Sequence, residues 1–228
     1  MILDRKGSTV LCVRWDPFTT LRHVPWIGGA QWAGKATVAG ILAEQYGLTY
    51  YRYDYHDRRG HQDRWIARLH RRGEVLAEPD LESTWVRATP QQMAEQAITR
   101  CYERFDWVQD DLRALMSLRP ILAEGWGLRP ELIAPITESL QRVVVMVPTE
   151  EFWERQLTQL PRAAIFRHQV SDSQLAQRNR IERNRLIAED VIRHARRLNV
   201  RVIEVDGTLE ERKGKRCNLN DTSILPTP

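Results

Sequence analysis

The sequence is poor in the features that mark secreted, zinc-binding and membrane proteins. Its three cysteines, Cys12, Cys101 and Cys217, are widely spaced and odd in number, which argues against a disulfide framework or a thiolate zinc site. No apolar run approaches the roughly 20 residues that span a bilayer, and the run near the start, residues 10–13, ends at Arg14. We therefore expect a cytoplasmic chain without a membrane partner.

Lysine is also scarce. Only four of the 34 basic residues are lysines, at positions 6, 35, 213 and 215, and the others are arginines. Against 30 acidic residues the net charge is +4, and most arginines lie beside Asp or Glu in segments of helical character, without a purely basic block. This distribution favours a solvated surface over a nucleic-acid interface.

The hydrophobic pattern predicts parallel strands joined by crossover helices, because short apolar runs alternate with helical periodicity. The predicted strands are residues 24–27, 48–53, 121–123, 143–147 and 200–205. The fourth run is unbroken and largely β-branched, as expected of a strand buried on both faces. With 228 residues, the chain is long enough for one sizeable core.

Capping signals mark several helix boundaries. Gly47 follows a periodic segment and suits the left-handed conformation found after a helix. Residues 89–92, Thr-Pro-Gln-Gln, supply a hydroxyl cap, a proline in the first turn and a glutamine three residues after the cap. Residues 171–173 are predicted to cap an arginine-rich helix that reaches about Leu198, whereas residues 55–88 show no clear periodicity.

One motif has a specific chemical meaning. Residues 29–35, Gly-Ala-Gln-Trp-Ala-Gly-Lys, have the Walker A spacing of a glycine, four residues, a second glycine and a lysine, between a predicted strand and a predicted helix. In such a loop the backbone N–H groups point at phosphate oxygens, the glycines permit positive φ angles, and the lysine reaches the β- and γ-phosphates. The 29–35 loop is therefore predicted to bind a nucleotide, the alternative being an ordinary glycine turn before a helix.

The position after the lysine departs from the usual motif. A serine or threonine normally stands there and supplies a hydroxyl to Mg²⁺, but this chain has Ala36, with Thr37 one residue later. One step along a helix rotates a side chain by about 100°, so Thr37 does not simply replace the missing hydroxyl. Either carboxylates and water hold the metal, or catalysis is weakened.

Further segments carry a family resemblance. They are Tyr53-Asp54, residues 121–125 (ILAEG), residues 178–189 (RNRIERNRLIAE) and residues 202–208 (VIEVDGT). Together with the loop they resemble a P-loop kinase of the small-molecule and nucleotide kinase group, in the P-loop NTPase superfamily, over most of residues 23–208. The resemblance implies a three-layer α/β fold: a mostly parallel five-stranded sheet flanked by helices, with a helical acceptor-binding and lid region.

The resemblance also implies one kinase-like domain, residues 1–228, with four accessory parts. These are an N-terminal extension (1–22), an acceptor-binding insertion (55–118), a lid-like helical region (170–198) and a loosely ordered tail (209–228). The expected activity is transfer of the γ-phosphoryl group of ATP, with Mg²⁺, to a hydroxyl or phosphate of a small molecule. In the insertion, aromatic and cationic residues suit a planar or anionic acceptor: Arg58, Arg59, Trp65 and Trp85.

Individual residues receive roles from the same resemblance. Asp54 is expected to orient or deprotonate the acceptor and, with Glu124 and Thr37, to organise Mg²⁺. Lys35 and the arginines of the lid helix, Arg178, Arg180, Arg183 and Arg185, are expected to stabilise charge on the transferring group. The expected nucleotide-binding residues are Gly29, Ala30, Gln31, Trp32, Ala33, Gly34, Lys35, Ala36, Thr37 and Gly207.

Other interpretations stand beside these. Asp54 and Glu124 can be solvated carboxylates at strand ends, and the arginine-rich helix can face solvent, paired with its own Glu182 and Glu189. A metal site is a further alternative, built from Asp54, His56, Asp57, His61 and Asp63. For the whole chain, the alternatives are a nucleotide-binding sensor or scaffold, in which Ala36 reflects lost catalysis, and a nucleic-acid-associated NTPase with salt-dependent binding.

Overall fold

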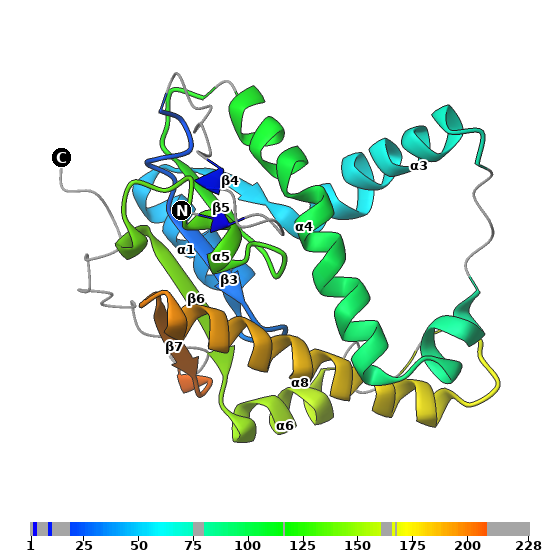
Figure 1. Cartoon of the computed structure of the whole chain (residues 1–228). Helices are drawn as coiled ribbons and strands as arrows, with labels where there is room; N and C mark the ends of the chain where they lie inside the picture. The colour runs from blue at the N-terminus through cyan, green and yellow to red at the C-terminus, as the bar shows by residue number, and fades with distance from the viewer. Residues whose placement is uncertain are drawn as a thin grey trace.

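The computed structural model in Figure 1 describes residues 2–3, 9–10, 19–74, 80–115, 117–160, 166 and 168–208. The strands are β1 (Ile2–Leu3), β2 (Thr9–Val10), β3 (Trp26–Gly29), β4 (Thr49–Arg52), β5 (Ile121–Glu124), β6 (Val143–Pro148) and β7 (Arg201–Val205). The α-helices are α1 (Lys35–Tyr46), α2 (Tyr53–His56), α3 (Gln62–Arg71), α4 (Pro90–Ala114), α5 (Pro130–Ile133), α6 (Glu150–Gln159) and α8 (Ser173–Arg197). The π-helices are η1 (Asp57–His61) and η2 (Ser83–Arg87), and η3 (Leu140–Arg142) is a 3₁₀-helix. The predicted tail, residues 209–228, lies outside the described residues, as does most of the predicted N-terminal extension.

A five-stranded parallel sheet forms the centre of the fold, in the order β4-β5-β3-β6-β7. β3 is the central strand, and its Ile27 is in register with Glu124 of β5 and Val144 of β6. β1 and β2 pair antiparallel in a separate small sheet. Each predicted strand is found, with its ends within two residues of the expected positions. The chain therefore has the expected α/β fold with a mostly parallel sheet.

Successive residues of the strands pack on opposite faces of the sheet. Along β6, Val143, Val145 and Val147 join one core cluster, whereas Val144 and Met146 join another. The first cluster contains buried residues of α4, α5 and α8, and the second contains residues of α1 and α6. Figure 1 shows α8 crossing in front of the sheet. Helices thus cover both faces and complete the three layers.

The helix ends follow the capping signals of the sequence. Thr89 and Gln92 form a reciprocal capping box at the start of α4, with bonds of 3.2 and 2.9 Å. Gly47 ends α1 with a φ of 61°, and Asp172 caps α8 by accepting the Leu175 N–H over 2.8 Å. In the described ranges, no helix is both long and apolar enough to cross a lipid bilayer.

Residues 55–88 contain more regular structure than their periodicity indicated, because α2, η1, α3 and η2 lie there. Strand β4 ends at Arg52, so Asp54 lies in the first turn of α2 instead of at the end of a strand. Helix α6, capped by Thr149, was also not anticipated. The boundaries of these elements differ from the predicted ones, but Asp54 still lies just after the second strand of the parallel sheet.

Buried polar contacts with α4 explain why this region was hard to predict. Arg104 donates to Asp57 Oδ1 over 2.7 Å, and His61 Nε2 lies 2.9 Å from Asp111 Oδ2, which His56 also approaches. Because these inward-facing residues are polar, hydrophobic periodicity does not reveal their helices. The alternative of a metal site in this cluster is wrong for the described residues, where no group of three His, Cys, Asp or Glu side chains is arranged to hold an ion.

Replacing Arg104 by alanine should destabilise the fold strongly. Arg104 and Asp57 are 5% and 8% exposed, so the variant would leave a buried carboxylate without its cation. We expect the free energy of unfolding, measured with urea, to fall by about 3 kcal/mol or more.

Two further variants test whether the unpaired buried carboxylate causes the loss of stability. Arg185→Ala breaks an exposed ion pair with Glu150 and should cost less than about 1 kcal/mol. The double variant Arg104→Met/Asp57→Leu should regain most of the loss, since no buried charge is left alone. A cost for Arg104→Ala no larger than that of Arg185→Ala would contradict a structural role for the buried pair.

Candidate active site

The 29–35 loop begins at two glycines that have no room for a side chain. A Cβ atom on Gly28 would lie 2.1 Å from the Leu128 carbonyl oxygen, and one on Gly29 would lie 2.1 Å from the Met146 carbonyl oxygen. Gly29 also has a φ of 118°, and the following Ala30 donates its N–H to the Met146 oxygen over 2.9 Å. The backbone of β3 is therefore held directly against its neighbours where the loop starts.

The loop ends at Gly34, the N-cap of α1, whose φ of 71° a glycine adopts without steric cost. Its carbonyl oxygen accepts the N–H groups of Thr37 and Val38 over 3.0 and 3.1 Å, which starts the helix. The positive φ angles expected of the loop glycines thus occur at Gly29 and Gly34. Trp32 also has a positive φ, 66°, which is an uncommon conformation for a bulky residue.

Lys35, the first residue of α1, lies folded over its own loop. Its Nζ donates a 2.7 Å hydrogen bond to the Ala30 carbonyl oxygen, and the residue is 7% exposed. Burial lowers the pKa of the ammonium, while the negative charges of Glu124 and Asp54 act in the opposite direction. A desolvated ammonium at a helix start is chemically suited to hold an anion such as a phosphate group.

Asp54 and Glu124 lie at the same rim of the sheet as the loop. Glu124 is the last residue of β5, and its Oε2 accepts a 2.9 Å hydrogen bond from the Tyr50 hydroxyl of β4. Asp54 follows β4, and its Oδ1 accepts the Trp126 N–H at 3.4 Å. Because the strands are parallel, their carboxyl ends meet at one edge, where open α/β sheets bind ligands.

The electrostatic environment raises the pKa of both carboxyls. For Glu124, which is 4% exposed, burial raises the pKa, the Lys35 ammonium opposes this effect, and the Asp54 charge adds to it. Asp54 is exposed as a residue, but its carboxyl is enclosed enough for desolvation to raise its pKa against the attraction of Lys35. Desolvated acids beside a buried cation are typical of functional sites.

Helix α8 contacts the loop through Asn184, whose Nδ2 donates a 3.0 Å hydrogen bond to Gln31 Oε1. Arg183 donates to Asn184 Oδ1 from Nε and Nη2, over 3.0 and 2.7 Å, and its guanidinium lies 5.1 Å from the centre of the Trp85 ring. Asn179 of the same helix donates to the Trp85 carbonyl oxygen over 3.0 Å. The structure therefore brings Arg183, from the predicted lid helix, close to the loop.

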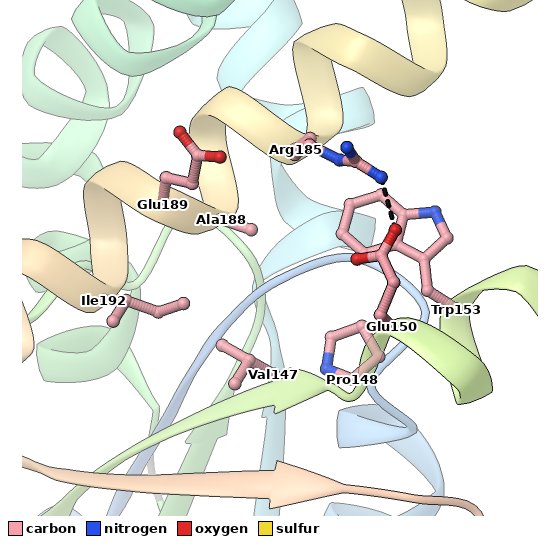
Figure 2. A pocket seen from close by; sticks show the side chains of 8 residues that line it. All are labelled: Val147, Pro148, Glu150, Trp153, Arg185, Ala188, Glu189 and Ile192. Carbon is pink, nitrogen blue, oxygen red and sulfur yellow. Dashed lines mark hydrogen bonds and ion pairs between the residues drawn. The ribbon is translucent and has the colours of Figure 1, made fainter.

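Two of the other three lid arginines, Arg178 and Arg185, have different surroundings. Arg178 is exposed near the start of α8. Arg185 points from α8 toward Glu150 at the start of α6 and pairs with it, as Figure 2 shows. This pair borders a cavity of about 230 Å³ between α6, α8 and the end of β6, lined by Val147, Pro148, Glu150, Trp153, Arg185, Ala188, Glu189 and Ile192. The described contact of Arg185 is thus with α6.

The remaining predicted nucleotide-binding residues lie around the loop and after the last strand. Ala36 and Thr37 are exposed in the first turn of α1, and the Ala36 carbonyl oxygen accepts the Tyr50 hydroxyl at 3.4 Å. Gly207 follows β7, where a Cβ atom would lie 2.6 Å from the Phe152 ring. The segment after β7 therefore packs tightly against α6.

Three contributors to the site were not identified from the sequence: Tyr50, Trp126 and Asn184. Trp126 acts through its backbone N–H, which no side-chain pattern signals. Tyr50 belongs to a segment with several aromatic residues, and nothing in its spacing separates a site residue from a packing residue. Asn184 had a signal, because it directly follows Arg183 within the segment that carries the family resemblance.

Comparison with known proteins finds similarity at the level of structure. No family model matches the chain, and no curated protein sequence matches it. Among solved structures, the chain is similar to a gluconokinase from Sinorhizobium meliloti 1021, with 15% sequence identity, a TM-score of 0.41, and coverage of 83% of this chain and 85% of that chain. The fold assignment rests on the sheet topology and the loop between β3 and α1 described above.

Asp54→Asn should make the ligand-free protein more stable at neutral pH. Burial raises the folded-state pKa of Asp54 above its ordinary value of 3.8, so ionisation of this carboxyl costs folding free energy above that range. Below about pH 3.8 the carboxyl is protonated in both states and the cost vanishes. The melting temperature of the variant should therefore exceed that of the wild type at pH 7, and the difference should shrink toward zero in acid.

The matched control is Asp63→Asn, an exposed aspartate on α3, which should change the melting temperature little at any of these pH values. Thermal unfolding between about pH 3 and pH 8 measures both variants. An Asp54→Asn protein less stable than the wild type at pH 7 would show that attraction to Lys35 outweighs desolvation.

Proposed function

We propose that the chain is an ATP-dependent kinase that transfers the γ-phosphoryl group to a hydroxyl or phosphate of a small molecule. The observation that carries this proposal is the cluster at the rim of the sheet, where Lys35 lies over the 29–35 loop and the charges of Asp54 and Glu124 act on it. A loop of this spacing between a central strand and a helix start suits phosphate groups. Carboxylates beside it suit a metal ion and an acceptor hydroxyl.

In this proposal the 29–35 loop holds the donor. The N–H groups of the loop and of the first turn of α1, together with the positive end of that helix, attract the phosphate oxygens. Lys35 exchanges the Ala30 carbonyl oxygen for a phosphate oxygen, a small movement for a side chain that already lies over the loop.

The carboxylates fit a magnesium ion. Mg²⁺ is usually bound by one or two carboxylates together with waters and substrate phosphates. Asp54 and Glu124 form such a set, and a cation would stabilise their charged forms, which burial disfavours. Thr37, exposed in the first turn of α1, is the hydroxyl we assign to the same shell in place of Ala36. The bound ion supplies neutralisation of charge on the phosphate oxygens.

Asp54 has the chemistry required to act on the acceptor. Its raised pKa makes the carboxylate a stronger base than an ordinary aspartate, and a base must lie within hydrogen-bond reach of the proton that it removes. Loose phosphoryl-transfer transition states need little base assistance. We therefore assign Asp54 mainly to orienting the attacking oxygen, with proton removal as the bond forms.

Arg183 completes the proposed constellation. Its neighbour Asn184 contacts Gln31 of the loop, and this contact supports the proposal that the guanidinium reaches the γ-phosphate. An arginine at this place stabilises the charge spread over the transferring group. Lys35 and Arg183 would thus approach the phosphates from two different helices.

Lys35→Ala should weaken the binding of Mg·ATP by about tenfold or more, because a charge-assisted hydrogen bond to phosphate is lost while the backbone amides are kept. Isothermal titration calorimetry measures the affinity. The control is Arg119→Ala. Arg119 is an exposed cation just before the start of β5, at the end of that strand opposite to Glu124. This variant should bind Mg·ATP like the wild type. Equal affinities for the wild type and Lys35→Ala would remove the central argument.

Asp54→Asn should impair phosphoryl transfer instead of nucleotide binding. The variant keeps the size of the side chain and one oxygen that can face the metal, and Glu124 is unchanged, so Mg·ATP should still bind within a few-fold of the wild type. Single-turnover transfer to the small-molecule acceptor should fall by about 10² if Asp54 orients and assists the nucleophile. Unimpaired transfer would exclude this role for Asp54. Tight ATP binding by the wild type without any transfer or hydrolysis would instead favour a nucleotide sensor, as the alanine at position 36 allows.

A further inference from the structure

The cavity of about 230 Å³ between α6, α8 and the end of β6 lies outside the proposed active site. Figure 2 shows that its walls come from these three elements. Of the described residues, those that line it include none of the 29–35 loop and neither Asp54 nor Glu124. A cavity of about 150 Å³ holds benzene, so this one has room for a molecule of roughly ten non-hydrogen atoms.

The inner walls of the cavity are apolar. Val147 of β6 and Trp153 of α6 are buried residues of the same core cluster. Ala188 and Ile192 face them from α8, one turn apart, as Figure 2 shows. Pro148 follows Val147 and has no N–H group to donate. These side chains suit a hydrocarbon body, because removing apolar surface from water favours binding.

Two carboxylates and one guanidinium border the cavity. Arg185 of α8 pairs with Glu150 of α6, and Figure 2 shows this pair on the Trp153 side. Glu189 follows Arg185 by one turn of α8 and lies on the other side of the cavity. Within the described part of the chain, Glu189 takes part in no ion pair. One negative charge is therefore left uncompensated beside an apolar cavity.

This arrangement of charges favours a cation over the other kinds of ligand. An anion would have to take Arg185 from Glu150 and would then lie beside two carboxylates of its own sign. A neutral molecule would gain nothing from the charge of Glu189. A cation gains attraction to the carboxylates while the Arg185–Glu150 pair stays intact.

We propose that this cavity binds a small organic cation, an ammonium group carried on an apolar body, as a ligand separate from the nucleotide and its acceptor. The apolar body lies between Val147 and Ile192, and the ammonium group points out toward Glu189. The proposal does not depend on the proposed kinase function, because the cavity shares no residue with the 29–35 loop or its carboxylates.

The expected affinity is weak, because the ligand is small and the charge that attracts it is exposed. Small molecules gain a limited binding free energy per atom, so we expect a dissociation constant of about a millimolar. Glu189 is exposed, so water and salt screen its attraction for a cation. A cation should therefore bind about threefold to fivefold more tightly than a neutral molecule of the same shape.

The experiment titrates probes of similar size onto the isotope-labelled full chain and follows its backbone amide signals by NMR. At pH 7 phenethylamine is a cation, 2-phenylethanol is neutral and phenylacetate is an anion. We expect phenethylamine to shift the signals of Trp153, Ala188 and Ile192 and to bind most tightly, with phenylacetate the weakest. High salt should reduce the advantage of phenethylamine over 2-phenylethanol, because it screens the charge of Glu189.

Three variants test the two parts of the site. Glu189→Gln keeps the size of the side chain and should weaken phenethylamine about threefold to fivefold while 2-phenylethanol binds as before. Glu154→Gln makes the same change at an exposed position of α6 outside the cavity and should leave every probe unaffected. Ile192→Trp adds bulk at a half-buried position of the wall and should weaken all the probes.

2-Phenylethanol also reports on the fold of the Glu189→Gln variant, because it needs the cavity but not the charge. The proposal is overturned if no probe shifts the signals of the cavity residues, or if 2-phenylethanol or phenylacetate binds as tightly as phenethylamine. It is equally overturned if Glu189→Gln binds phenethylamine as well as the wild type does. Failure of the chain to bind ATP would contradict the proposed kinase function alone and would leave these results unchanged.

Discussion

The close approach of backbones at Gly28 and Gly29 is the constraint on which the rest of the site depends. At these positions β3 passes so near to Leu128 and to Met146 of β6 that even a methyl group would collide with a carbonyl oxygen. The contact fixes where the central strand ends and where its loop begins. Lys35 and the first turn of α1 follow from that point, so their position relative to Glu124 on the adjacent strand is set by the sheet itself.

Helix α8 supplies the opposite wall of the site and is held along its whole length. Toward its C-terminal end, Asp190 pairs with Arg129, a residue only 1% exposed that also bonds Glu131 over 2.5 Å. Toward its N-terminal end, Ser171 bonds Glu82, just before η2. The buried ion pair costs desolvation energy and is poor evidence of net stabilisation. Its geometric effect is to keep α8 aligned with the sheet, so that Asn184 meets the loop.

The sequence was sufficient for the sheet, the loop and the major helix caps, because each of these depends on local signals. Apolar runs identified the strands, and Thr89, Gly47 and Asp172 lie where capping rules place them. The predicted insertion, residues 55–118, had no such local signals. There the inward-facing side chains are Asp57, His61 and other polar groups that pair with α4, and a pairing between residues 50 apart in the chain has no local pattern.

The features of the candidate site also divide into those with a local sequence signal and those without one. The spacing of glycines and lysine predicted the loop conformation at Gly29 and Gly34, whereas the positive φ of Trp32 had no counterpart in the motif. Asp54 and Glu124 were expected at one rim because parallel strands end together. That Arg183 approaches the loop while Arg185 pairs with α6 depends on the rotation of α8 about its axis, which the run of arginines alone does not determine.

The hydrogen bond from Lys35 to the Ala30 carbonyl has a consequence for selectivity. Water has already been removed from the ammonium during folding. In the proposed function, the group gives up the Ala30 carbonyl oxygen when it takes a phosphate oxygen. The number of hydrogen bonds is unchanged by this exchange, so the gain comes from replacing a dipole with a full negative charge. Under this proposal, a neutral molecule of the same shape gains nothing from the lysine, and the loop selects its ligands by charge first and by shape second.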